Sequence, residues 1–171
     1  MLDPKMQEAF NRQINAELYS SYLYLSMAAY FESQGLKGMA NWMRIQVQEE
    51  LQHVVKFNDF VIERGGRVLL TAVDGPKTDW ASPLEVFQDA YEHECKVSEL
   101  INNLVDLATA ERDHASSVFL QWFITEQVEE EASALEVVDK LKLVADHPHA
   151  LFMIDKDLAQ RTLQPAAEPA G

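Results

Sequence analysis

A set of three polar side chains of kinds that bind metal ions occurs twice along this chain with the same spacing. The six are Glu17, Glu50 and His53 and, 77 residues further along, Glu94, Gln127 and Glu130. Carboxylate, amide and imidazole groups are costly to bury unless something pairs them. All six nevertheless fall in segments whose other inward positions are apolar, so we expect a chain built around a polar centre.

The types of these side chains favour one class of metal ion. Carboxylates with few imidazoles suit Fe²⁺ or Mn²⁺, whereas thiolate-rich sites suit zinc or iron–sulfur clusters. Residues three apart lie on one helix face and can share one ligand sphere. Glu50 with His53 and Gln127 with Glu130 have this spacing, and the single cysteine, Cys95, cannot build a thiolate cluster. The pattern therefore predicts an oxygen-rich metal site on helices.

Capping signals and hydrophobic spacing predict five helices that would position these side chains. Asp3-Pro4 and Ser82-Pro83-Leu84-Glu85 are signals for a helix N-terminus, and Gly65-Gly66 is a C-terminal stop. The predicted helices cover about residues 4–35, 37–65, 83–111, 114–145 and 148–162. The Pro- and Ala-rich residues 164–171 are expected to be a disordered tail, which leaves one domain over residues 1–163.

The lengths of the connections predict the topology. The first and second helices, and the third and fourth, are joined by turns of a few residues, so each pair should form an antiparallel hairpin. A helix of about 28 residues is roughly 42 Å long, and about 16 extended residues reach roughly 50 Å. Residues 67–81, which contain the only β-like run at 68–70, can therefore span the bundle once. We predict an all-α four-helix bundle with one long crossover and a short fifth C-terminal helix.

Steps of four and three residues define the positions of each helix that should face the core. The resulting seams are Phe10, Ile14, Glu17, Ser21, Tyr24 and Ala28; Met39, Met43, Gln46, Glu50, His53, Phe57 and Phe60; Phe87, Tyr91, Glu94, Ser98, Ile101 and Val105; and Ser116, Leu120, Phe123, Gln127, Glu130, Ala134 and Val137. Polar residues interrupt all four seams at the same level. A pseudo-two-fold axis through the bundle would bring the six polar side chains together.

Composition and charge argue against two classes of partner. The chain has 171 residues, of which 28 are acidic and 14 basic, and its formal net charge is −14. This charge repels a phosphate backbone and favours cations near the surface, so we expect no nucleic-acid partner. The sequence has neither a cleavable signal nor an apolar run of about 18 residues, so we expect no membrane partner and a cytoplasmic location.

Three stretches of the sequence resemble the non-haem bacterial ferritins. They are Asn15-Ala16-Glu17-Leu18-Tyr19-Ser20-Ser21, Gln48-Glu49-Glu50-Leu51-Gln52-His53, and Phe119-Leu120-Gln121-Trp122 together with Glu126-Gln127-Val128-Glu129-Glu130-Glu131. The likeness extends over about 160 residues and includes all five helices. It implies a ferroxidase that oxidises Fe²⁺ with O₂ or H₂O₂ and stores ferric mineral in a cage of about 24 identical subunits. It also implies a reductant, unidentified here, that releases the iron.

The resemblance implies a role for each residue of the repeat. Glu17, Glu50 and His53 would hold a first iron, and Glu50 would bridge it to a second iron held by Glu94 and Glu130. Gln127 would lie beside the second iron and orient a ligand or a water molecule.

Further residues match positions around the di-iron centre of this family. A third, more open iron site would draw on Glu49, Glu126, Glu129 and Glu130. Tyr24 matches a tyrosine that lies near the di-iron centre and can supply an electron, and Trp122 would have a similar part.

Departures from related families narrow the prediction. The Gln127 and Glu130 pair replaces the second Glu-x-x-His motif of the bacterioferritins, and Leu51 stands where they carry a haem-ligating methionine. We therefore expect no haem. A single cysteine excludes the rubrerythrins, which need a Cys-x-x-Cys iron domain.

The residues by themselves leave other functions open. Glu-x-x-His motifs and acidic runs such as 126–131 also occur on solvated helix faces, and Tyr24 also fits an ordinary core position. A di-iron oxygenase, a peroxidase-like enzyme or a manganese catalase would share the metal pattern. A helical bundle that serves as a scaffold would share the outline, but it would not need a repeated polar layer.

Overall fold

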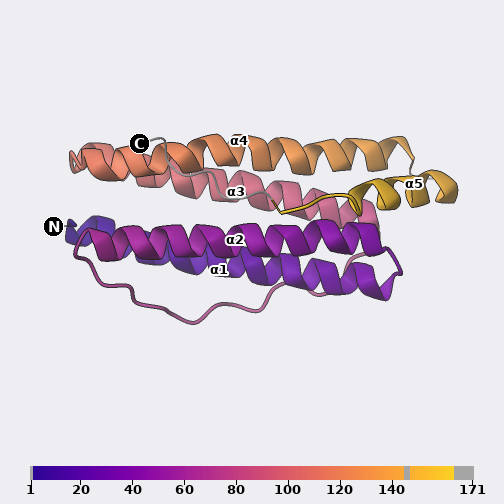
Figure 1. Cartoon of the computed structure of the whole chain (residues 1–171), viewed down its shortest axis with the longest axis horizontal. Coiled ribbons are helices and arrows are strands. Elements are labelled where there is room, and N and C mark those ends of the chain that lie inside the picture. The colour runs from indigo at the N-terminus through magenta and orange to yellow at the C-terminus, as the bar shows by residue number, and fades with distance from the viewer. Residues whose placement is uncertain (1, 145–146, 164–171) are drawn as a thin grey trace.

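Most of the residues that the structure describes lie in five helices (Figure 1). The computed structural model describes residues 2–144 and 147–163, so the predicted tail at 164–171 lies outside the described residues. The helices are α1 Pro4–Ser33, α2 Lys37–Glu63, α3 Pro83–Ala110, α4 His114–Leu143 and α5 Pro148–Leu158, and none of the described residues is in a strand. The predicted fold class is therefore confirmed. Over the same residues, no helix is long and apolar enough to cross a bilayer.

Local sequence signals set where the helices begin and end. The side chains of Asp3, Ser82 and Asp113 cap α1, α3 and α4 by accepting a backbone N–H two or three residues further on, at 2.8, 3.2 and 3.1 Å. Such bonds satisfy donors that the first turn of a helix leaves without a partner. Each of the first two helices ends before a glycine with positive φ, 74° at Gly35 and 72° at Gly65.

The fifth helix is shorter than predicted. It ends at Leu158 and not near residue 162. Asn41 on α2 provides the reason, because its side-chain amide donates to the carbonyls of Leu158 at 3.4 Å and Arg161 at 3.0 Å. These bonds tie the chain to α2 in place of another helical turn.

The predicted crossover is confirmed. In Figure 1 residues 64–82 run along the bundle from the end of α2 to the start of α3, so that these two helices are parallel. Asn11 on α1 holds this segment by donating to the carbonyl of Arg67 at 3.0 Å and accepting the N–H of Leu69 at 2.6 Å. The β-like run at 68–70 is therefore an extended segment bound to a helix side chain and not a strand.

A layer of buried polar side chains divides the apolar core into two clusters. One cluster, which includes Phe31 and Phe87, lies toward α5, and the other, which includes Phe10 and Phe57, lies toward the opposite end. The polar side chains between them are each exposed by 5% or less: Glu17, Gln46, Glu50, His53, Glu94, Gln127 and Glu130. The predicted interruption of the four seams at one level is confirmed.

The inward positions differ from the prediction at five places. The half-buried predicted positions are Ser21, Phe60, Tyr91, Ser98 and Val105, and the neighbours buried in their place are Ser20, Val61, Ala90, Val97 and Leu104. A straight helix has about 3.6 residues per turn, so a seam read at 3.5 drifts away from the core along a long helix.

The fifth helix approaches the first turn of α2 very closely. Asp155 Oδ1 accepts the N–H of Met39 at 2.8 Å and so caps α2 from another helix. A Cβ at Gly38 would lie 1.6 Å from the carbonyl oxygen of Asp155, so only glycine permits this approach.

Replacing Gly38 with alanine should push α5 away from α2. We expect Gly38→Ala to lower the free energy of unfolding in urea by about 1–3 kcal/mol, although alanine is the better helix former. Gly75→Ala is the control, because a Cβ there meets nothing within 4 Å. If both variants unfold like the original chain, the close packing of α5 is wrong.

Candidate metal centre

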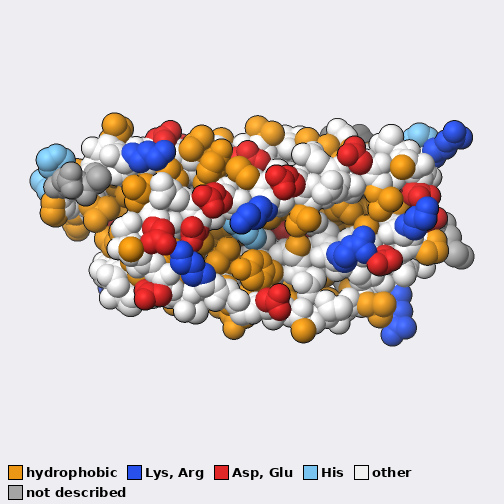
Figure 2. Space-filling view, turned by 180° about the vertical axis from the view of Figure 1, so that it is seen from behind, with side chains coloured by type: hydrophobic (Ala, Val, Ile, Leu, Met, Phe, Trp, Pro, Cys, Tyr) orange, Lys and Arg blue, Asp and Glu red, His pale blue; other side chains and the backbone are white. Residues whose placement is uncertain are grey.

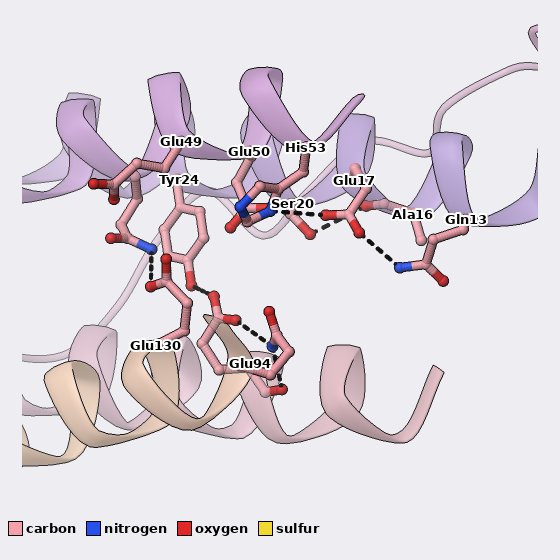
Figure 3. A network of polar contacts seen from close by, with 12 residues as sticks. Gln13, Ala16, Glu17, Ser20, Tyr24, Glu49, Glu50, His53, Glu94 and Glu130 are labelled. Carbon is pink, nitrogen blue, oxygen red and sulfur yellow. Dashed lines mark hydrogen bonds and ion pairs between the residues drawn. The ribbon is translucent and has the colours of Figure 1, made fainter. Parts of the chain in front are cut away.

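Glu17, Glu50 and His53 converge inside the polar layer (Figure 3). One ligand atom of each lies within 4.8 Å of those of the other two. His53 Nδ1 is 3.6 Å from Glu17 Oε2 and 3.5 Å from Glu50 Oε2, which are long distances for hydrogen bonds. Both of these carboxylate oxygens are buried without a hydrogen-bond partner. Three potential metal ligands therefore share one small, buried volume, as predicted.

The charges of this triad are strongly coupled. Burial alone would lower the pKa of His53, but attraction to the Glu17 and Glu50 carboxylates raises it well above its usual value. Burial raises the pKa of Glu50 well above its usual value, with the charges of Glu94 and Glu17 adding to it. Burial acts in the same direction on Glu17, yet contact with His53 outweighs it and lowers the pKa. In the absence of a metal, protons thus neutralise part of the buried charge.

The other half of the repeat lies across the bundle on α3 and α4, and protein donors already hold its carboxylates. The Tyr24 hydroxyl donates to Glu94 Oε1, and Gln127 Nε2 donates to Glu94 Oε2 at 3.1 Å. Gln46 Nε2 donates to Glu130 Oε2 at 2.8 Å. The structure therefore brings this half to the predicted level. Its carboxylates already accept hydrogen bonds, whereas two carboxylate oxygens of the first half have no donor.

The surroundings of Glu94 and Tyr24 disfavour their ionised forms. Burial, reinforced by the charge of Glu130, raises the pKa of Glu94 to about 8 against the opposing effect of the Tyr24 and Gln127 hydrogen bonds. Burial and the charge of Glu94 raise the pKa of Tyr24 well above its usual value. Tyr24 therefore keeps its proton as a hydrogen-bond donor.

Sequence reasoning missed the roles of several supporting side chains, although it placed Gln46 at an inward position. Gln13 donates to Glu17 Oε1 at 2.7 Å, and Gln46 holds the opposite half. Ser20 Oγ lies 2.8 Å from His93 Nε2, and burial lowers the pKa of His93 to about 4, which keeps this imidazole neutral. The sequence feature that could have indicated these roles is a polar side chain close to the predicted metal ligands on the same helix. Gln13 lies one helical turn before Glu17, and Gln46 lies one helical turn before Glu50.

The residues predicted for a third iron site form an acidic rim beside the layer. Glu126 and Glu130 repel Glu49, and Glu129 repels Glu126. Burial raises the pKa of Glu49 to about 7, although the charge of Arg161 opposes this. These four carboxylates thus influence one another electrostatically, but their oxygens do not converge as those of Glu17, Glu50 and His53 do, and the third iron site stays a prediction. Arg161, which sequence reasoning missed, forms an ion pair with Glu49.

Trp122, for which the resemblance implies a part near the metal centre, lies against His53 of the first half of the layer. The centroid of its ring is 5.4 Å from that of His53, in an edge-on arrangement. Lys56 Nζ lies 4.3 Å from the same ring centroid. The indole therefore contacts both the imidazole and the ammonium group of Lys56.

The acidic surplus of the chain is not gathered on the face opposite to that of Figure 1. Figure 2 shows acidic, basic and apolar side chains interspersed over that face. The net charge of −14 therefore does not form one uniform patch there.

Comparison with known proteins agrees with this geometry. The family model described as a ferritin-like domain matches residues 7–144. The chain belongs to the ferritin-like family. The bacterial non-heme ferritin of Bacteroides fragilis is 48% identical over 161 residues, which cover 94% of this chain and 100% of that protein. The bacterial non-heme ferritin of Staphylococcus saprophyticus is 38% identical and covers 95% and 97% of the two chains. The resemblance to non-haem bacterial ferritins is confirmed.

Solved ferritin structures show the same fold. An open-pore ferritin from the hyperthermophilic archaeon Archaeoglobus fulgidus superposes with a TM-score of 0.94 and 57% identity, over 95% of this chain and 99% of that chain. A closed form of the Archaeoglobus fulgidus ferritin, engineered by site-directed mutagenesis, gives a TM-score of 0.95 and 56% identity, over 96% and 100%. Membership of this family supports iron storage as the broad function.

The raised pKa of Glu94 predicts how stability depends on pH in the metal-free protein. Between about 4.5 and about 8 the folded chain holds this proton and the unfolded chain does not, so stability falls as the pH rises through that range. Glu94→Gln removes the titration. At pH 8, in the presence of a chelator, urea unfolding should show this variant to be more stable by roughly 2 kcal/mol, and the difference should vanish toward pH 5.

Glu92→Gln is the matched control, because Glu92 is exposed on the same helix. It should change stability equally little at either pH. The prediction is contradicted if the free energy of unfolding of Glu94→Gln differs from that of the original chain by the same amount at both pH values. Glu94 would then not titrate in this range.

Proposed function

We propose that the chain oxidises Fe²⁺ at a di-iron centre in the polar layer of each subunit and stores the Fe³⁺ as a mineral inside a cage. The observation that carries the oxidation step is the pair of buried, unpartnered oxygens, Glu17 Oε2 and Glu50 Oε2, beside His53. Buried polar atoms in native proteins nearly always have a partner. An iron ion supplies that partner for both oxygens at once.

The charge of the layer supports two ions. Glu17, Glu50, Glu94 and Glu130 are all buried, and when ionised these four carboxylates balance two Fe²⁺ ions. Without metal, the raised pKa values of Glu50 and Glu94 show that protons take over this task. Binding of iron therefore releases protons from the layer.

Each bound Fe²⁺ gives up one electron in the reaction. Two electrons and two protons convert O₂ to H₂O₂, and the same number convert H₂O₂ to two water molecules. The protein's part is to hold both ions side by side, with Glu50 between them, and to neutralise the charge that develops. Its two apolar clusters exclude bulk water from both sides of the layer.

The two iron positions differ in what must move before an ion can bind. The first position, at Glu17, Glu50 and His53, offers carboxylate oxygens without donors. At the second, Glu94 and Glu130 must give up donors that they already have. The second iron should therefore bind less tightly than the first.

Other predicted residues have supporting roles in this proposal. Gln127, which bonds to Glu94, orients the second position. Tyr24 and Trp122 each lie against one half of the layer and can supply an electron to the oxidant. The acidic rim of Glu49, Glu126, Glu129 and Glu130 provides a third, more open position through which iron leaves.

Storage requires a closed volume that a single bundle does not enclose. We therefore propose a homo-oligomeric shell of about 24 subunits, in the cytoplasm. Release of iron then requires a separate reductant.

Removal of the first iron position should abolish fast oxidation. We expect Glu50→Ala combined with His53→Ala to lower the initial rate of aerobic Fe²⁺ oxidation, followed by absorbance of Fe³⁺, by at least about tenfold. Asp59→Ala combined with Glu63→Ala is the control, since it removes two exposed carboxylates from the same helix. An unchanged rate in the first double variant would refute the assignment.

Storage can be separated from simple metal binding by mass and stoichiometry. Native mass spectrometry should show a shell near 24 subunits, and aerobic addition of Fe²⁺ should load it far beyond the two or three ions per chain that the centre itself can hold. A monomer, or an oligomer that saturates at two or three ions per chain, would instead favour a di-iron redox enzyme.

A further inference from the structure

Arg161, in the segment that follows α5, places its guanidinium on one carboxylate of the acidic rim. Arg161 Nη2 lies 2.7 Å from Glu49 Oε2. The two side chains are only 22% and 11% exposed, so the pair is better shielded from water than a surface ion pair. Charge-assisted bonds of this kind are among the stronger polar contacts in a protein.

Contacts that do not involve Glu49 hold Arg161 in this place. Its carbonyl accepts the Asn41 side-chain amide at 3.0 Å. Its guanidinium carbon lies 4.4 Å from the centroid of the Trp42 ring, and Nη1 donates to the Trp42 carbonyl at 3.4 Å. Trp42 itself packs edge-on against Phe87 in the core. The position of the cation is therefore built into the fold.

The geometry of α2 explains how one arginine reaches both sites. Trp42 and Glu49 are seven residues apart, so they lie on the same face of the helix, about 10 Å apart along its axis. Arg161 is anchored at Trp42 and extends toward Glu49. The charges of Glu126 and Glu130 also act on Glu49, and they raise its pKa where the charge of Arg161 lowers it.

We infer that Arg161 is the resident counter-cation of the third iron position: it occupies Glu49 while no metal is there and is displaced when a metal ion binds. The inference rests on the proposed function, which assigns Glu49 to that position. A guanidinium keeps its proton at any relevant pH, so it must move away and cannot simply be neutralised. Arg161 thus competes with iron for Glu49. This competition lowers the affinity of the third position for iron, so that iron can leave it readily.

Displacement of Arg161 couples the rim to the chain after α5. Thermodynamic linkage makes the coupling reciprocal: the free energy that Arg161 takes from metal binding at Glu49 equals the free energy that a bound metal ion takes from the attachment of residues 159–163 to the bundle. The first two iron positions do not use Arg161, so they should not sense its removal. This selectivity distinguishes competition from a purely structural role.

Anaerobic Fe²⁺ titration of the assembled protein, followed by calorimetry, tests the inference. In Arg161→Gln the third equivalent should bind about tenfold more tightly or better than in the original chain, while the first two are unchanged. Arg161→Lys keeps a cation and should stay close to the original chain. Arg44→Gln is the matched control, since Arg44 is a paired arginine of the same bundle, bound to Glu32, and its loss changes net charge equally.

A second arm follows the displaced segment. Hydrogen exchange at the amides of residues 159–163 should quicken when the third equivalent is added to the original chain, and Glu49→Gln, which removes the rim ligand, should abolish that response.

The possible outcomes separate the two proposals. If the original chain binds two equivalents tightly and a third weakly, but Arg161→Gln leaves the third unchanged or weaker, Arg161 is structural and only this inference is overturned. If the original chain binds no tight equivalents, the proposed function is wrong and the inference falls with it.

Discussion

Burial of a layer of carboxylates in the middle of a helical bundle is the constraint on which the rest of the structure depends. Four acidic side chains of the layer are exposed by 5% or less, and charge in such a place is costly unless it is neutralised. Without metal, the chain meets this cost with raised pKa values, a protonated His53, and donors from Tyr24, Gln46 and Gln127. Among the buried side-chain nitrogen and oxygen atoms of the described residues, only Glu17 Oε2, Glu50 Oε2 and Gln46 Oε1 remain without hydrogen-bond partners. Two of these three atoms belong to the first half of the repeat, which is where a cation would be most strongly attracted.

The fold delivers this arrangement by repeating one helical hairpin. Each hairpin contributes one carboxylate from its first helix and an i,i+3 pair from its second, and the crossover at residues 64–82 turns the second hairpin so that both sets meet at one level. The two apolar clusters, which pack on opposite sides of the layer, hold the four helices in the register that keeps the polar side chains at one level. The segment that follows the fifth helix then adds Arg161 at the edge of the layer, and the close approach that Gly38 permits holds that helix against α2. Positioning of the centre is thus shared by elements that lie far apart in the sequence.

Much of the fold and of the site could be predicted from the sequence, because both depend on spacing. The capping residues Asp3 and Ser82 and the stop at Gly65 marked helix ends correctly, and the 77-residue repeat located six of the seven residues of the layer. The missed features depend on contacts between distant segments. Nothing local indicates that Asn41 ends α5 at Leu158, or that Arg161 reaches Glu49. The inequality of the two halves was visible as Gln127 in place of glutamate, but its physical form, an open half and a donor-filled half, required the structure.

Crystals soaked anaerobically in Fe²⁺ and measured at the iron absorption edge would test the central claim most directly. The proposed centre predicts two anomalous peaks in the polar layer of every subunit, with the stronger one among Glu17, Glu50 and His53 and the weaker one beside Glu94 and Glu130. Peaks confined to surface carboxylates, or a layer that remains without any peak at iron concentrations that saturate oxidation, would contradict it.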